Sequence, residues 1–215
     1  MAKAEKVKYA ISRRRLNVIV AAVVLFVICL SFVDRYFGGG FREGVLLRVP
    51  RAVGAEKYHL KTFKVVKIVD GDTLDIDIAD GKYDTTRVRL LGVDTPETKK
   101  AGVEIMYYGP EATAFTSSAA LGKEVTIVID TVSDVRDRYG RLLAYVRLED
   151  GSFLNEELIK RGYGYGDVRF AHSRYDKFME LSRQAIESKA GLWQEVKRDQ
   201  LPRWLQRERP ALLAK

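Results

Sequence analysis

Four charged side chains lie in a short stretch of the chain, RVRLLGVDTPE, at residues 87–97, and three of them could do chemistry together. Arg89, Asp94 and Glu97 surround an apolar run and a Thr-Pro pair. Hydrolysis of a phosphate ester needs a cation or guanidinium to hold the charge that builds up on the phosphate oxygens, and a base to activate water. An ordinary strand followed by a capped turn is the alternative, and the rest of the chain must decide between them.

Three further segments carry acids, arginines or tyrosines where loops are expected: DGDT (70–73), YYGPEA (107–112) and DRYGRLLAY (137–145). Singly, each group has a simple explanation: DGDT is a good tight turn, Asp94 can cap a turn, Glu97 can be a surface acid and Arg141 can begin a strand. Together they suit phosphodiester chemistry. Oxygen ligands from Asp72 and Asp94 would select Ca²⁺ or Mg²⁺ over Zn²⁺, and paired arginines match phosphate oxygens better than lysines do.

The elements that must position these groups have the order β-β-β-α-β-β-α-α. Strands are predicted at 63–69, 74–80, 85–93, 123–130 and 141–148, and helices at 109–122, 152–162 and 173–193. Alternation of Leu74 and Ile76 with Asp75 indicates a half-solvated strand, and Ser152 is the expected N-cap of its helix. This order predicts an α+β fold, a five-stranded OB-fold barrel with about three flanking helices.

The barrel has to bring Arg89 and Asp94 together, because strand geometry alone does not. The two residues are five apart, so their side chains face opposite ways on a straight strand. A turn at Thr95-Pro96 and closure of the barrel are expected to make them converge.

An apolar segment near the N-terminus is predicted to cross a membrane. Residues 16–33 are 18 consecutive uncharged residues, which as a helix span about 27 Å, close to the hydrocarbon thickness of a bilayer. Six Lys or Arg precede it, so residues 1–15 are expected in the cytoplasm and the domain on the other side of the cell membrane. A buried core helix and a cleaved signal peptide, with secretion of the domain, are the alternatives. Bulky residues after the apolar run favour an uncleaved signal anchor.

Composition divides the rest of the chain into three parts. Residues 34–60 are expected to be a linker, residues 61–194 a domain and residues 195–215 a basic tail. The net charge of +8 resides at the two ends, since 61–194 carry 20 Lys or Arg against 22 Asp or Glu. The high pI is therefore weak support for nucleic-acid binding. The tail is expected to be solvated, with contact to a membrane surface or nucleic acid as the alternative.

Five segments occur in an order that resembles a known family. They are VDGDTLDI, RVRLLGVDTPETKK, YYGPEATAFT, DRYGRLLAYV and LNEELIKRGYG. Over residues 63–193 the chain resembles the staphylococcal nuclease (thermonuclease) family. The resemblance implies an OB-fold barrel and an enzyme that hydrolyses DNA and RNA with one Ca²⁺ ion, leaving 3′-phosphate and 5′-hydroxyl ends. A monomer is expected, and no protein partner is inferred.

The resemblance also assigns roles to residues of these motifs. The expected protein ligands of the ion are the carboxylates of Asp72 and Asp94 and the carbonyl of Thr95. Glu97 corresponds to the general base that orients or deprotonates the attacking water. The two arginines that bind the phosphate and stabilise the transition state correspond to Arg89 and Arg141.

Substrate contacts transfer less completely. Tyr139 matches a tyrosine near the terminal phosphate, and Arg138 stands where the family has a lysine. The family's base-stacking tyrosine has no clear match after GYG, which leaves Tyr165 or Phe170 to take its place. His172 is interpreted as a surface residue.

The resulting prediction is a membrane-anchored, Ca²⁺-dependent nuclease that acts outside the cytoplasm. The alternative is a nucleic-acid-binding or scaffold module of the same fold with a degenerate site. Such a module should lack part of the charged set, whereas this chain keeps all of Asp72, Arg89, Asp94, Glu97 and Arg141.

Overall fold

The computed structural model describes residues 54–98 and 105–208. The predicted cytoplasmic segment and signal anchor (1–33), and most of the predicted linker, lie outside the described residues. Among the residues that are described, no helix is both long enough and apolar enough to cross a bilayer. The membrane anchor therefore stays a prediction.

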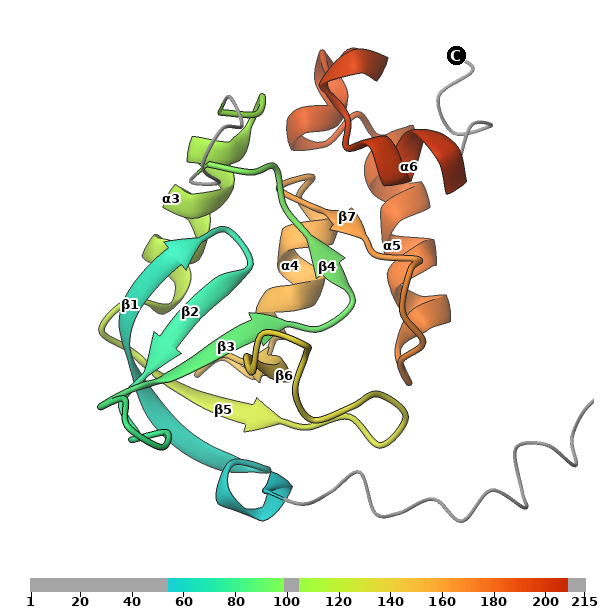
Figure 1. Cartoon of the computed structure of the whole chain (residues 1–215). Helices are drawn as coiled ribbons and strands as arrows, with labels where there is room; N and C mark the ends of the chain where they lie inside the picture. The colour runs from blue at the N-terminus through green and yellow to red at the C-terminus, as the bar shows by residue number, and fades with distance from the viewer. Residues whose placement is uncertain (1–53, 99–104, 209–215) are drawn as a thin grey trace, which may run out of the picture. The chain divides into compact units, whose positions relative to one another are not determined.

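Five strands form the closed barrel that the order of elements predicts (Figure 1). Around the barrel they follow the order β1-β2-β3-β6-β5, in which β3 and β6 are parallel and the other neighbours antiparallel. Their bounds are β1 (Lys61–Asp70), β2 (Thr73–Ile76), β3 (Thr86–Leu90), β5 (Glu124–Val128) and β6 (Leu142–Arg147). Two short strands, β4 (Val93–Asp94) and β7 (Tyr165–Gly166), pair outside the barrel.

Three α-helices in the described chain agree with the predicted ones, and a fourth follows them. They are α3 (Gly109–Ala120), α4 (Leu154–Lys160), α5 (Tyr175–Glu187) and α6 (Arg203–Glu208). Three short 3₁₀ helices, η1 (Ala55–Lys57), η2 (Gly191–Gln194) and η3 (Arg198–Gln200), complete the described elements.

Apolar side chains from all five strands fill the barrel. The apolar residues of the barrel strands that are at most 1% exposed are Val65, Leu74, Ile76, Val88, Leu90, Val125, Ile127, Leu142, Ala144 and Val146. Leu154, Leu158 and Ile159 of α4 join the same cluster and are fully buried. Each such Leu, Ile or Val side chain contributes about 1.5–3 kcal/mol to folding, so this cluster provides a rigid base for the loops above it.

Two predicted strands end three or four residues earlier than expected. The strand predicted at 74–80 ends at Ile76, and Asp75 is buried rather than solvated because Arg87 lies opposite it on β3 and donates two hydrogen bonds of 2.8 and 3.0 Å to its carboxylate. The strand predicted at 85–93 breaks after Leu90. Gly92 has a φ of +74°, a conformation that favours glycine, and the chain turns there into β4.

Two helix boundaries also differ. Ser152 does not cap α4, because its backbone N–H and its hydroxyl both donate to Asp150; Phe153 occupies the N-cap position without a side-chain hydrogen bond. The helix predicted at 173–193 ends at Glu187. Lys189 and Gly191 both have positive φ values, so the chain leaves the helix axis before η2.

His172 is buried, which contradicts its interpretation as a surface residue. Only 4% of it is exposed, and its Nδ1 shares a 2.9 Å hydrogen bond with the hydroxyl of Tyr145. The imidazole packs so closely on Gly92 that a Cβ there would lie 2.6 Å from two of its ring atoms. Burial lowers the pKa of His172, so the ring is neutral at pH 7 and acts as a packing residue under the β3–β4 turn.

Tyr145 is expected to make the fold sensitive to alkaline pH. Burial raises the pKa of its phenol from 10.0 to about 12. The folded state therefore keeps a proton that the unfolded chain loses above pH 10. As a result, the free energy of unfolding falls by roughly 2–3 kcal/mol as pH rises from 10 to 12. Urea unfolding of the wild type and Tyr145→Phe at pH 9 and pH 12 measures it. The variant should lose less stability over this interval, and an equal loss would contradict the assignment.

Candidate active site

Asp72 lies in the turn between β1 and β2, and both of its oxygens are engaged. Its Oδ1 accepts a hydrogen bond from Thr73 Oγ1 at 2.9 Å, and its Oδ2 accepts from the backbone N–H and the hydroxyl of Thr95 at 2.9 and 3.1 Å. The turn is anchored to α3 by Thr116, whose hydroxyl donates to the Gly71 carbonyl at 2.6 Å. Asp72 is only 5% exposed, so these contacts hold a nearly buried carboxylate in one orientation.

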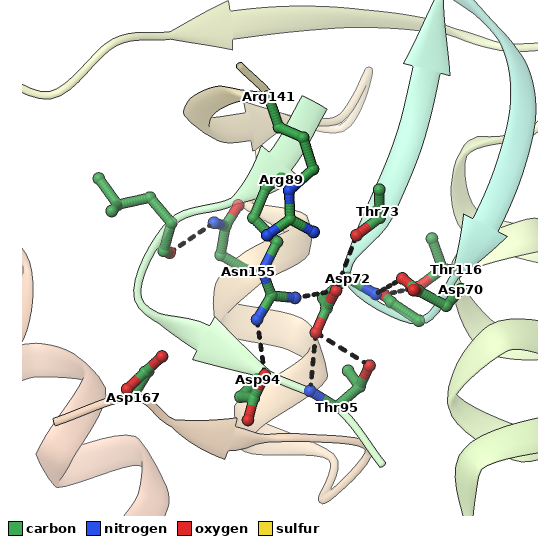
Figure 2. A network of polar contacts seen from close by, with 12 residues as sticks. Asp70, Asp72, Thr73, Arg89, Asp94, Thr95, Thr116, Arg141, Asn155 and Asp167 are labelled. Atoms are coloured by element: carbon green, nitrogen blue, oxygen red, sulfur yellow. Dashed lines mark hydrogen bonds and ion pairs between the residues drawn. The ribbon is translucent and has the colours of Figure 1, made fainter. Parts of the chain in front are cut away.

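Arg89 joins the two carboxylates that the sequence singles out (Figure 2). It lies on β3 opposite Thr73. Its Nη1 forms an ion pair with Asp72 Oδ1, and its Nη2 donates to Asp94 Oδ1 at 2.6 Å. The guanidinium is only 13% exposed, so it pairs with both acids in a partly desolvated place where such pairs are strong.

The turn that brings Asp94 to Arg89 is at Leu91–Gly92, not at Thr95-Pro96 as predicted. Asn155 of α4 holds this turn, because its side-chain amide donates to the Leu91 carbonyl at 2.9 Å while its Oδ1 accepts from Val146 N on β6 at 2.9 Å. After the turn, β4 pairs with β7, and this pairing fixes the backbone at Asp94. The buried side-chain amide of Asn155 therefore helps to set the position of Asp94 relative to Arg89.

Asp70 is a third acid of this region, and the sequence interpretation did not include it. Desolvation raises the pKa of its carboxyl, while the charges of Arg89 and Arg141 act to lower it and that of Asp94 to raise it. Asp70 is the first acid of the turn that contains Asp72. Its Oδ1 accepts a hydrogen bond from Asp72 N at 3.3 Å. Its place in the DGDT motif was the signal available in the sequence.

Arg141 directs a second guanidinium toward the cluster formed by Asp72, Arg89 and Asp94. Asp137 accepts from its backbone N–H at 2.9 Å and from its Nε at 2.7 Å. Within the described part of the chain, its terminal nitrogens Nη1 and Nη2 have no hydrogen-bond partner. Figure 2 shows the side chain directed toward Arg89 and Asp72, so a fork of two N–H donors remains available to an anion.

The two predicted substrate-contact residues lie beside Arg141 on the same loop. Tyr139 is 69% exposed, and its ring faces the guanidinium groups of Arg138 at 4.8 Å and Arg141 at 5.5 Å. Arg138 Nη2 also donates to the Tyr139 hydroxyl at 2.6 Å. An exposed tyrosine between two cations is suited to contact an anionic ligand.

Glu97 follows β4 by three residues, and its main chain is fixed. Its carbonyl accepts a hydrogen bond from Met106 N at 2.9 Å, and the residue is half-buried. Asp72, Arg89, Asp94 and Thr95 are thus directly linked by hydrogen bonds and ion pairs, with Glu97 adjoining them along the backbone.

The described C-terminal residues contain site contacts that the sequence did not reveal. Trp204 of α6 and Arg169 both reach Asp94 Oδ2, at 2.8 and 3.1 Å. The interpretation of residues 195–215 as a solvated tail is therefore wrong for Trp204 and its neighbours Leu201 and Leu205, each at most 7% exposed. Their spacing at positions i, i+3 and i+4 was the only signal of a buried face.

The residues predicted to hold a cation could provide some of its ligands but not all of them. Asp72 and Asp94 each direct one oxygen at the same guanidinium, so two carboxylates already converge on one positive charge. Oxygen ligands of this kind suit Ca²⁺. No cluster of three or more His, Cys, Asp or Glu side chains able to hold a metal occurs among residues 54–98 and 105–208, so backbone carbonyls and water would have to complete the coordination.

The small closed barrel carries a nearly buried aspartate, a second and partly exposed aspartate, an arginine that bridges the two, and a further arginine with free N–H donors. These groups suit an enzyme that acts on phosphate esters. Comparison with known proteins gives the same result. The family model described as "Staphylococcal nuclease homologue" matches residues 87–195.

Curated relatives support this match. A thermonuclease of Staphylococcus hyicus is 35% identical over 144 residues, covering 66% of this chain and 82% of the relative. A thermonuclease of Staphylococcus intermedius is 31% identical over 173 residues, covering 80% and 95%. An uncharacterized endonuclease of Escherichia coli O157:H7 is 32% identical over 146 residues, covering 68% and 84%.

The chain belongs to the staphylococcal nuclease family. The predicted barrel and the predicted enzyme class, a nuclease that hydrolyses phosphodiester bonds, are thereby confirmed.

Proposed function

We propose that the protein is a Ca²⁺-dependent nuclease that cleaves both DNA and RNA. The observation that carries the proposal is the guanidinium of Arg89, which joins Asp72 to Asp94 beside the free fork of Arg141. Phosphodiester hydrolysis uses both features, since carboxylate oxygens bind a hard cation and guanidinium forks bind phosphate oxygens.

The proposed ligands of one Ca²⁺ ion are the carboxylates of Asp72 and Asp94 and the carbonyl of Thr95. When bound, the ion supplies positive charge that polarises the phosphate ester. The acids are held ready for this role without it, because Arg89 and the N–H and hydroxyl of Thr95 fix their orientation.

The remaining residues handle the phosphate and the proton. Arg89 and Arg141 neutralise the charge that develops on the non-bridging oxygens as the water oxygen bonds to phosphorus. Glu97 accepts the proton of that water. The P–O5′ bond breaks and O5′ takes a proton from solvent, which leaves a 3′-phosphate and a 5′-hydroxyl.

Exposed aromatic side chains are the proposed contacts to the rest of the nucleotide. Tyr139, with the neighbouring Arg138, is the proposed contact to the terminal phosphate. Of the two candidates for base stacking, Tyr165 is 2% exposed and cannot reach a ligand, whereas Phe170 is 61% exposed and lies beside Arg169. Phe170 is therefore the residue proposed to stack on a base.

Incubating the full-length chain with single-stranded DNA and RNA oligonucleotides tests the proposal. Cleavage should occur with Ca²⁺, stop in excess EGTA and return when Ca²⁺ is restored, and mass spectrometry should find 3′-phosphate fragments. Full activity in EGTA would remove the metal from the mechanism. Binding without cleavage would favour the alternative, a scaffold module of the same fold.

The proposed location is the cell membrane, with the nuclease domain on the extracytoplasmic side. The support is the uncharged stretch at 16–33 and the basic residues before it. The same assay on cell fractions should find the activity in the membrane pellet, attached to a chain of full mass. A mature chain that begins after residue 33 would replace the anchor with a cleaved signal peptide.

A further inference from the structure

The segment after α5 folds back onto the active site and packs there through an apolar cluster. Leu201, Trp204 and Leu205 are buried against Tyr165 of β7 and Leu192 of η2. The rings of Trp204 and Tyr165 meet edge to face at 6.4 Å. Since β7 pairs with β4, the strand that carries Asp94, this cluster lies directly beside a proposed ligand of the ion.

Trp204 makes one polar contact from this cluster, and it is to that ligand. Its indole Nε1–H donates to Asp94 Oδ2 at 2.8 Å. Arg169 Nη2 approaches the same oxygen at 3.1 Å, and its guanidinium lies 4.4 Å from the centre of the Trp204 ring. Asp167 holds Arg169 in place by accepting hydrogen bonds of 2.8 and 2.7 Å from its Nε and Nη2.

The two oxygens of Asp94 therefore have separate partners. Oδ1 faces Arg89, whereas Oδ2 is occupied by Trp204 and Arg169. An aspartate held on one side only could rotate about its Cβ–Cγ bond, but one held on both sides keeps its carboxylate plane. Hydrogen bonds that hold metal-ligating carboxylates in this way are worth about 10–100-fold in metal affinity or activity.

We propose that Trp204 is a positioning residue of the nuclease site, which, with Arg169, fixes Asp94 so that Oδ1 is presented to the cation and Arg89. This inference rests on the proposed function. It makes the described residues after 195 part of the active site rather than an appendage to the domain.

Packing alone does not explain the indole contact. Trp193 belongs to the same cluster, and its ring meets Tyr165 edge to face at 5.8 Å. Its Nε1 is buried and, among the described residues, has no hydrogen-bond partner. The cluster thus accommodates an indole N–H without satisfying it, so the hydrogen bond of Trp204 to Asp94 is a specific arrangement.

The chain contains two tryptophans, so each provides one indole signal and one matched variant. In ¹⁵N-labelled full-length protein without Ca²⁺, Asp94→Ala should shift the Trp204 indole resonance and leave that of Trp193 in place. Trp204→Phe, which keeps an aromatic ring but removes the donor, should weaken Ca²⁺ binding about tenfold by calorimetry and lower kcat in step. Trp193→Phe, the control, should bind Ca²⁺ and turn over as the wild type does.

Three outcomes would overturn the inference: an unmoved Trp204 resonance in Asp94→Ala, wild-type Ca²⁺ affinity in Trp204→Phe, or equal weakening in both tryptophan variants, which would indicate packing alone. Should Trp204→Phe fail to fold, the resonance in Asp94→Ala decides, because it needs no change at Trp204. A wild type that binds no Ca²⁺ at all would refute the proposed metal dependence and the cation part of this inference. In that case the Trp204 indole resonance in Asp94→Ala would still test whether Trp204 contacts Asp94.

Discussion

Arg141→Ala is expected to lower kcat by about a thousandfold while the protein stays folded. The loss is large because a guanidinium that meets the phosphate oxygens stabilises charge that exists fully only in the transition state. The fold should survive, because the side chain is held by one acid of its own loop, Asp137, and takes no part in the core. Arg141→Lys should recover only part of the rate, since lysine keeps the charge but lacks the fork.

Glu97→Ala should cause a loss of similar size if Glu97 is the base that activates the attacking water. The measurement is single-turnover cleavage of a labelled oligonucleotide at saturating Ca²⁺, with thermal unfolding to verify folding. Arg183→Ala is the control, because this arginine pairs with Glu180 and Glu187 on the exposed face of α5. Losses below about tenfold in both site variants would argue against the assigned roles.

Arg89→Met is expected to destabilise the protein by about 3–5 kcal/mol in the absence of Ca²⁺. Methionine retains much of the side-chain volume but removes the charge that pairs with Asp72 and Asp94 at once. Asp72 would then be a nearly buried carboxylate with its ion pair gone. Ca²⁺ should recover part of the stability, because a cation bound by these acids in the folded state alone shifts the folding equilibrium.

Urea unfolding with and without Ca²⁺ measures this effect. Arg87→Met is the matched control, since Arg87 lies on the same strand and pairs with Asp75, away from the proposed ligands. Its side chain is 47% exposed, so its loss should cost less, and Ca²⁺ should stabilise this variant only as much as the wild type. A stable Arg89→Met, or one that Ca²⁺ affects no more than Arg87→Met, would show that Arg89 is not the counter-ion of the two acids.

The barrel could be predicted from the sequence because its strands follow local rules. Apolar alternation indicated β2, the DGDT turn marked its beginning, and the Gly-Pro pair at 109–110 marked the start of α3. The charged groups were also visible, since they lie within short motifs. The direction of the chain between Arg89 and Asp94 was not, because it depends on Asn155, more than sixty residues away, and on a glycine against which His172 packs.

The contacts of the C-terminal segment could not be predicted for a related reason. Its composition is basic and broken by prolines, and only Leu201, Trp204 and Leu205 hint at a buried face. Whether such a face finds a partner depends on Leu192, which lies nearby in the chain, and on Tyr165, which is distant in the sequence. Single polar side chains such as His172 are equally hard to place, because one buried partner, Tyr145, decides their environment.

The indole of Trp204 and the carboxylate it binds are 110 residues apart in the chain. Synthesis proceeds from the N-terminus, so all five barrel strands, the last of which ends at Arg147, leave the ribosome before Trp204 is added. A newly made chain can therefore close its barrel while Asp94 still lacks its indole partner. Assembly of the catalytic centre is completed only after the scaffold that carries it.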